Sequence, residues 1–274
     1  MSLASLTAMT SPAATPATST SSAHLAGRHA LVTGGGGGLG SAIALRLAAD
    51  GARITLADID EDKMAAVAER IREQGGEAGT WRLDLSDTAA LADLRLEVDV
   101  LVNNAGIQHV APIHEFPVER WELIQRLMVT APFLLIRACL PHMYARGWGR
   151  IVNISSAHGL RASAFKSAYV AAKHGLEGLS KVTALEGAGK GVTSMCVNPG
   201  YVWTPLVAQQ VADQARAHGM SEDEVAEKVM LASQPLKEFA SVEAVADAVA
   251  FCTGPHSTSM TGSNIVVDGG WTAR

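Results

Sequence analysis

Short β-branched runs alternate with Ala- and Leu-rich stretches of helical period along most of the chain. The strand-like runs, each bounded by Gly, Asn, Asp or Ser, cover residues 29–33, 53–57, 79–83, 98–102, 150–154, 191–197 and 264–267. The helical stretches between them include residues 41–49, 62–74, 121–144, 168–185 and 242–252. Parallel strands need crossover connections, which helices supply. The sequence therefore predicts an α/β fold, a single doubly wound parallel sheet with helices on both faces.

Composition limits the partners of this chain. Its 274 residues, 48% of them hydrophobic, are enough for one large core. The net charge of −5 offers no clustered positive charge for phosphates, so we expect no nucleic-acid partner. Cys139, Cys196 and Cys252 are far apart and have no metal-ligand spacing, so we expect no metal site. Without an uninterrupted apolar run of about 18 residues, we expect no membrane partner and a cytoplasmic location.

The first two dozen residues differ from the rest of the chain. Residues 2–23 consist mainly of Ala, Ser, Thr and Pro and carry no charge. Such a segment buries too little apolar surface to offset the entropy lost on ordering. We therefore expect a disordered tail over residues 1–24 and one folded domain over residues 25–274.

A glycine-rich turn follows the first strand and precedes the first helix. Glycines let the backbone approach a pyrophosphate closely, and the free N–H groups of a helix start attract its charge. The alternative is a flexible loop without a ligand, but the strand before it and the helix after it favour nucleotide binding. The predicted contacts are Thr33, Gly34, Gly37, Gly38, Leu39 and Gly40.

An acidic residue, Asp58, ends the second strand, about twenty residues after the turn. A carboxylate there accepts hydrogen bonds from both adenosine ribose hydroxyls and repels a ribose phosphate. The sequence therefore predicts NAD rather than NADP. The alternative is that Asp58 only caps the next helix.

Five motifs occur in order along the chain. They are Thr-Gly-x-x-x-Gly-x-Gly at 33–40, Asn-Asn-Ala-Gly at 103–106, Ser156, Tyr169-x-x-x-Lys173 and Asn-Pro-Gly at 198–200. In these motifs the chain resembles the short-chain dehydrogenase/reductase family over residues 25–274. The resemblance implies a Rossmann-type domain and a homotetramer formed through the helices at 121–144 and 168–185.

The resemblance also implies a catalytic trio of Ser156, Tyr169 and Lys173. Tyr169 and Lys173 are four residues apart and share one face of a helix. A free tyrosine has a pKa of about 10, so it needs a nearby cation to act as a base. Tyr169 would then exchange the alcohol proton while Ser156 holds the substrate oxygen. Standing alone, this Tyr–Lys pair would be read as an ordinary solvated helix face.

Further cofactor contacts follow from the same resemblance. Asp84 and Leu85 match positions that contact adenine, although Asp84 could equally cap a helix. The remaining predicted contacts are Asn104, Ala105, Gly106, Tyr169, Lys173, Pro199, Val202 and Thr204.

Local sequence around these motifs resembles bacterial 3-hydroxybutyrate dehydrogenases. The resemblance implies that Gln108, His158, Lys166 and Gln210 gather at a substrate carboxylate, beside Ser156 and Tyr169. A small acid in a closed pocket needs a cation and several donors to replace lost water. The expected reaction is the interconversion of (R)-3-hydroxybutyrate and acetoacetate. The alternatives are turn, surface or solvated roles for these four residues.

Two other functions remain open on the sequence. The first is a 3-oxoacyl thioester reductase or another short-chain alcohol dehydrogenase. The second is a nucleotide-binding module without catalysis, because Met128 stands where the family usually has an asparagine of its proton relay. The span from Asp84 to Asp99 is also about two helical turns shorter than usual. Residues 205–240 are expected to form a substrate lid, with a capping box from Ser221 to Glu224.

Overall fold

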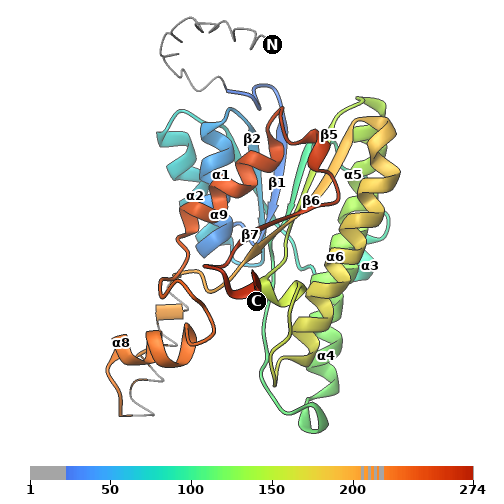
Figure 1. Cartoon of the computed structure of the whole chain (residues 1–274). Coiled ribbons are helices and arrows are strands. Elements are labelled where there is room, and N and C mark those ends of the chain that lie inside the picture. The colour runs from blue at the N-terminus through green and yellow to red at the C-terminus, as the bar shows by residue number, and fades with distance from the viewer. Residues whose placement is uncertain (1–22, 205–206, 209–210, 213–214, 216–218, 274) are drawn as a thin grey trace, which may run out of the picture.

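In the part of the chain that the structure describes, seven parallel strands form one sheet in the order β3-β2-β1-β4-β5-β6-β7 (Figure 1). The computed structural model describes residues 23–204, 207–208, 211–212, 215 and 219–273. The strands are β1 (His29–Thr33), β2 (Arg53–Asp58), β3 (Ala78–Arg82), β4 (Val100–Asn103), β5 (Gly149–Ile154), β6 (Val192–Pro199) and β7 (Asn264–Val267). The predicted doubly wound parallel sheet is confirmed. The strand order reverses between β1 and β4, the place where open α/β sheets bind ligands.

Helices cover both faces of the sheet (Figure 1). One layer holds α1 (Gly38–Ala49), α2 (Glu61–Glu73) and α9 (Val242–Thr253). The other holds α4 (Val118–Gln125), α5 (Ala131–Ala145), α6 (Ser167–Gly187) and the short α3 (Thr88–Leu91). The four residues of α3 agree with the short connection predicted between Asp84 and Asp99.

Successive strand residues divide between two cores, which explains why the strands are hydrophobic throughout. In β1, Ala30 and Val32 pack in the core under α1 and α9, whereas Leu31 packs in the core under α5. In β4, Val102 packs in the core under α1 and α9, and Leu101 packs in the core under α5. Side chains alternate across a strand, so a sheet covered on both faces needs an apolar residue at nearly every position.

The long helix predicted over residues 121–144 contains a π-helical turn. Arg126–Thr130 lies between α4 and α5 and places Met128 at its centre. By length and composition, the combined run Val118–Ala145 could cross a membrane, with 44% of its most apolar window buried. Its α5 part packs against the sheet through Leu135, Cys139 and Met143.

The proposed tail and lid are described only in part. Residues 1–22 lie outside the described residues, and His24 Nε2 lies 3.2 Å from Thr253 Oγ1. Within the lid segment, α8 (Glu222–Val225) begins with the predicted capping box. Ser221 Oγ accepts the Glu224 backbone N–H at 3.2 Å, and the Glu224 carboxylate accepts the Ser221 N–H at 3.2 Å. The capping box predicted from Ser221 to Glu224 is confirmed.

Candidate active site

The glycine-rich turn is fixed by hydrogen bonds from the end of β4. Thr33 Oγ1 accepts the backbone N–H groups of Asn104 at 3.0 Å and Ala105 at 3.1 Å. Asn104 Nδ2 donates to the Thr33 carbonyl at 2.9 Å and to the Gly34 carbonyl at 3.3 Å. A Cβ on Gly40 would collide with the Gly34 carbonyl. At Gly34, Gly35 and Gly40 the turn therefore leaves no room for a side chain, as close approach to a pyrophosphate requires.

Helix α1 begins at this turn without a side-chain cap. Gly37 is the N-cap residue, and no acidic side chain lies in the first turn. Gly37 and Gly38 are exposed, whereas Leu39 is partly buried against the core. Free N–H groups at a helix start, with their partial positive charge, suit an anionic phosphate.

The Asp58 carboxylate faces the glycine-rich turn. Its Oδ2 accepts the Gly36 N–H at 3.1 Å, and its Oδ1 accepts the N–H groups of Ile59 at 2.7 Å and Asp60 at 3.2 Å. The cap of α2 is Asp60, which accepts the Lys63 N–H at 3.1 Å. Asp58 is thus not the helix cap that the alternative interpretation proposed.

The predicted trio lies together where β5 ends and α6 begins. Lys173 is buried, and its Nζ donates to the Ile154 carbonyl at 2.7 Å. Its ammonium lies 5.5 Å from the centroid of the Tyr169 ring. The Ser156 side chain hydrogen-bonds to Tyr169 and accepts the His158 N–H at 3.1 Å. The sheet edge and one helix turn therefore bring all three functional groups into one site.

Burial dominates the electrostatics of this trio. Burial raises the pKa of Tyr169 above its ordinary value, and the hydrogen bond with Ser156 opposes this rise. Burial also lowers the pKa of Lys173 to about 8, although the nearby Glu177 acts in the opposite direction. The Tyr–Lys pair predicts a lowered pKa for Tyr169, but among the protein's own groups the pKa of Tyr169 is raised.

His158 is buried between two aromatic rings. Its ring meets the Tyr169 ring edge-on at 5.9 Å and the Trp271 ring at 4.8 Å between centroids. Its Nε2 lies 3.0 Å from Ser163 Oγ and its Nδ1 3.5 Å from Ser156 Oγ. Burial, with smaller contributions from Lys166 and His174, lowers the pKa of His158 to about 4. The imidazole is therefore neutral near pH 7.

Of the other predicted substrate contacts, Lys166 is partly exposed, and its charge helps to lower the pKa of His158. Its Nζ donates to the Tyr201 hydroxyl at 3.4 Å. Gln108 is exposed on the loop after β4. The Ala111 N–H on that loop donates to the Phe165 carbonyl at 3.0 Å, which ties it to the segment carrying Lys166. Gln210 lies outside the described residues.

The remaining predicted cofactor residues lie along the same edge of the sheet. Thr204 follows Pro199 and Val202 on the segment after β6, and its methyl group lies 3.7 Å from the position of a Cβ on Gly38. Gly106 follows Ala105, and a Cβ there would meet Met128 at 3.5 Å.

Two further predicted cofactor residues follow β3. Asp84 is exposed, and its carboxylate accepts the Ser86 N–H at 2.8 Å and the Ser86 hydroxyl at 2.7 Å. These bonds lower the pKa of Asp84. Leu85 is buried in the core under α5.

Sequence reasoning missed several residues of the site. Glu177 is buried one turn after Lys173, and its carboxylate accepts Nδ2 of Asn198 at 2.6 Å and of Asn264 at 2.5 Å. The i, i+4 spacing from Lys173 could have indicated it. Trp271 has no local signal, because it reaches His158 only through the folding of the C-terminus.

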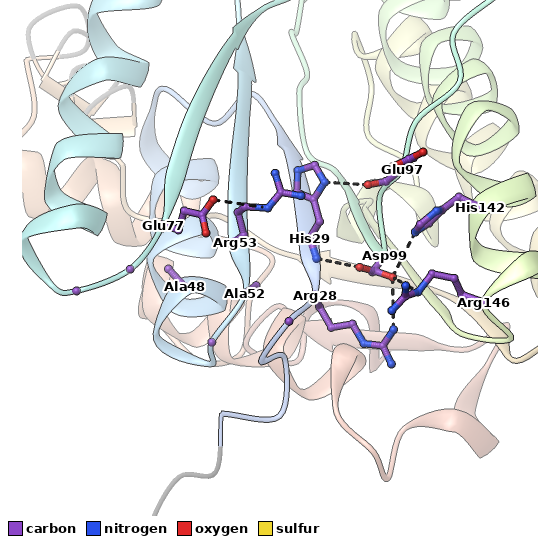
Figure 2. A pocket seen from close by; sticks show the side chains of 14 residues that line it. Arg28, His29, Ala48, Ala52, Arg53, Glu77, Glu97, Asp99, His142 and Arg146 are labelled. Carbon is purple, nitrogen blue, oxygen red and sulfur yellow. Dashed lines mark hydrogen bonds and ion pairs between the residues drawn. The ribbon is translucent and has the colours of Figure 1, made fainter.

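A pocket of about 480 Å³ opens at the opposite edge of the sheet, before β1, β2 and β4 (Figure 2). Asp99 binds Arg28 at 3.4 Å and lies 3.5 Å from both Arg146 and His142. Ligands of such sheets bind at the carboxyl ends of the strands. The candidate active site is therefore at the other edge, with Ser156 and Tyr169.

Comparisons with known proteins agree with this geometry. Residues 28–215 match the family model described as short chain dehydrogenase. D-beta-hydroxybutyrate dehydrogenase from Rhizobium meliloti is 45% identical over 256 residues, 89% of this chain and 98% of that protein. The enzyme of the same name from Cupriavidus necator is 41% identical over 257 residues, 91% of this chain and 100% of that protein.

A solved structure shares the whole fold. L-sorbose reductase from Gluconobacter frateurii, complexed with NADPH and L-sorbose, superposes with a TM-score of 0.85 at 28% identity, over 91% of this chain and 98% of that chain. The predicted family is confirmed: the chain belongs to the short-chain dehydrogenase family and is an oxidoreductase of that family, which uses a nicotinamide cofactor.

Proposed function

We propose that this oxidoreductase interconverts (R)-3-hydroxybutyrate and acetoacetate with NAD, and that Tyr169 exchanges the proton. One observation carries the proposal: the charge of Lys166 acts on the buried His158, whose backbone N–H donates to Ser156 Oγ at 3.1 Å, so a cation lies near the proposed reacting groups. The similarity to two D-beta-hydroxybutyrate dehydrogenases, at 45% and 41% identity, supports the same substrate.

The residues at the carboxyl end of the sheet fit a dinucleotide. The glycine-rich turn suits a pyrophosphate, because Gly40 packs against the Gly34 carbonyl without room for a Cβ and lets the backbone come close. The start of α1, which has no side-chain cap, offers its N–H groups to the same phosphates. The Asp58 carboxylate would accept hydrogen bonds from the adenosine ribose hydroxyls, and Lys173 would bind the nicotinamide ribose. When bound, NAD supplies the hydride acceptor and a positive charge beside the phenol.

The protein groups have distinct tasks in the reaction. Ser156 donates a hydrogen bond to the substrate oxygen and fixes its position. Tyr169 takes the hydroxyl proton during oxidation and returns it during reduction. The buried Lys173 ammonium favours the ionised phenol, whose pKa burial alone would raise.

Carboxylate recognition rests on the charge of Lys166. His158 has a pKa lowered to about 4, so near pH 7 it acts as a neutral hydrogen-bonding group and adds no positive charge. Gln108 and Gln210 are the proposed neutral donors that complete the site. A closed pocket needs such donors because the carboxylate loses its water there.

The choice of NAD rests on Asp58. Its carboxylate occupies the place at which a ribose phosphate of NADP would suffer repulsion. The basic side chain of Lys63, which lies beside Gly36 as Asp58 does, is paired with Asp60 at 2.8 Å. The L-sorbose reductase structure contains NADPH, so the assignment of NAD rests on Asp58 and not on membership of the family.

The proposed assembly of the protein is a homotetramer. Apolar side chains are exposed on the helices that would form its contacts: Trp121 on α4 is 38% exposed, Phe133 on α5 47% and Leu185 on α6 82%. Burying them in a subunit interface would remove this surface from water. Light scattering of the purified protein tests the mass of the assembly.

One assay tests the proposed substrate. NADH formation is followed with each enantiomer of 3-hydroxybutyrate, in the wild type and in Lys166→Ala. We expect turnover of the (R) enantiomer and a KM raised about 10-fold or more in the variant, because a charged hydrogen bond is lost. Lys190→Ala is the matched control, since Lys190 also lies over a tyrosine ring, Tyr144, outside the site.

The same assay tests the thioester alternative. Acetoacetyl thioesters should be inert with NADH. Turnover of a thioester at the rate of acetoacetate, unchanged by Lys166→Ala, would overturn the carboxylate proposal and favour the thioester reductase.

A further inference from the structure

Tyr169 must exchange its proton with solvent in every catalytic cycle, yet it is packed against an apolar cluster on the side of the π-helical turn. Met128 is buried there with Ile124, Ala168 and Ala172. A thioether has no exchangeable proton, and none of the other three side chains has one. This side of Tyr169 therefore offers it no side-chain proton carrier.

A chain of polar side chains leaves Tyr169 in another direction. The Ser156 side chain hydrogen-bonds to Tyr169, and Ser156 Oγ lies 3.5 Å from His158 Nδ1. His158 Nε2 lies 3.0 Å from Ser163 Oγ. Ser163 and Tyr169 are partly exposed, whereas Ser156 and His158 are buried. The chain thus passes through the buried part of the site and ends at the surface.

We infer that His158 relays the proton of Tyr169 to solvent, through Ser156 on the inside and Ser163 on the outside. The inference rests on the proposed function only in that Tyr169 exchanges a proton with the substrate. It assigns to His158 a task beyond contact with the substrate carboxylate.

The protonation state of His158 suits a relay. Its pKa is lowered to about 4, so the ring is neutral near pH 7 and has one donor and one acceptor nitrogen. The charged or titratable groups around it are Lys166, His174 and Tyr169, and the first two favour the neutral ring. A neutral imidazole can take a proton at one nitrogen while it releases one at the other.

The steps balance. In oxidation, the hydride goes from C3 of the alcohol to the nicotinamide and the hydroxyl proton goes to Tyr169. After hydride transfer the Ser156 hydroxyl turns from the substrate oxygen to His158, and the Tyr169 proton passes to Ser156 Oγ as the Ser156 proton passes to Nδ1 of His158. His158 releases its Nε2 proton to Ser163, whose own proton leaves to water. Reduction runs the same steps in reverse.

His158→Gln tests the relay, because an amide fills similar space but does not carry a proton in this way. We expect kcat to fall about 10-fold or more at pH 7, within the range of a lost proton-transfer step. The isotope effect of C3-deuterated substrate should fall towards unity, and the solvent isotope effect should rise. Added imidazole should restore kcat in proportion to its concentration.

Two further variants locate the chain. Ser163→Ala removes the outer hydroxyl without touching Tyr169 and should lower kcat in the same direction as His158→Gln. Ser155→Ala is the matched control, because the buried Ser155 hydroxyl has no hydrogen-bond partner among the described residues. It should keep the wild-type kcat and isotope effects.

The relay and the proposed substrate fail in different ways. If His158→Gln raises only KM, or loses kcat without any response to imidazole, the relay is overturned and the substrate stands. If the wild type oxidises other alcohols but not 3-hydroxybutyrate, the substrate is wrong, and the relay is judged on those alcohols. A wild type that oxidises no alcohol overturns both.

Discussion

At the scale of single residues, the Asp58 carboxylate combines an observed contact with the nucleotide turn and the proposed role in cofactor choice. It holds the Gly36 N–H of the nucleotide turn at 3.1 Å and lies at the end of β2, where an adenosine ribose would bind. Its position followed from the sequence, because the end of a strand about twenty residues after the turn is set by local pattern. Its bond to the turn did not, because that depends on how β1 and β2 pair.

Changing Asp58 to Asn should alter cofactor choice. The amide keeps an oxygen acceptor for Gly36 but removes the charge that repels a ribose phosphate. We expect the ratio of kcat/KM for NADP to that for NAD to rise about 10- to 100-fold, the size of one charged hydrogen bond. Steady-state kinetics with both cofactors measure it.

Asp62→Asn is the control for this prediction, because Asp62 is exposed on the first turn of α2. It should leave the ratio unchanged. A ratio equally unchanged in Asp58→Asn would remove the basis for assigning NAD.

His158 marks where residue-level prediction stopped. Its place near Ser156 follows from two positions of separation in the sequence. Its ring packs against Trp271, which is distant in the sequence, and no local sequence pattern encodes that contact. The lowered pKa follows from the burial of this ring, so it could not be predicted either.

At the scale of elements, the turn from β1 into α1 depends on close backbone approach. Gly40 and Gly34 meet so tightly that no Cβ fits between them. Gly40→Ala should therefore weaken NADH binding about 10-fold or more and lower the free energy of unfolding by about 1–3 kcal/mol, the usual cost of overpacking. Fluorescence titration of NADH and urea unfolding measure the two effects.

Gly178→Ala is the matched control for the turn, because Gly178 lies in α6 with open space around it. It should leave NADH binding unchanged and stabilise the protein by about 0.5–1 kcal/mol, as alanine does in a helix. Equal tolerance of both substitutions would contradict the close approach.

Element order was largely predictable and element detail was not. The sequence predicted a helix over residues 121–144, but the periodicity could not reveal the π-helical turn at Arg126–Thr130, which shifts the hydrogen bonds by one residue. The strand runs were predictable because both faces of the sheet are buried, which leaves long apolar stretches. Strand order required the structure.

At the scale of the whole molecule, the buried His158 should make stability depend on pH. Its pKa is about 4 in the folded protein and about 6.5 in an unfolded chain, so the unfolded state binds more protons between these values. The free energy of unfolding should therefore fall as pH drops from 6.5 to 4, by on the order of 3 kcal/mol.

Urea unfolding of the wild type and His158→Gln across this range measures the contribution. The variant should lose less stability on acidification than the wild type. His29, whose pKa is also lowered by burial, contributes in the same direction to both proteins, so the difference between the two slopes isolates His158. If the free energy of unfolding changed equally with pH in both proteins, His158 would not be buried as a neutral imidazole.

The most direct test of the account is the rate of NADH formation from (R)-3-hydroxybutyrate in the wild type, Tyr169→Phe and the control Tyr144→Phe, with NADH affinity measured in parallel. The account predicts that Tyr169→Phe loses about 10²- to 10⁴-fold in kcat. The affinity for NADH should fall far less than kcat, because one of many predicted cofactor contacts is lost, and Tyr144→Phe should keep its rate. A Tyr169→Phe protein that forms NADH at the wild-type rate would contradict the assignment of the proton to this phenol.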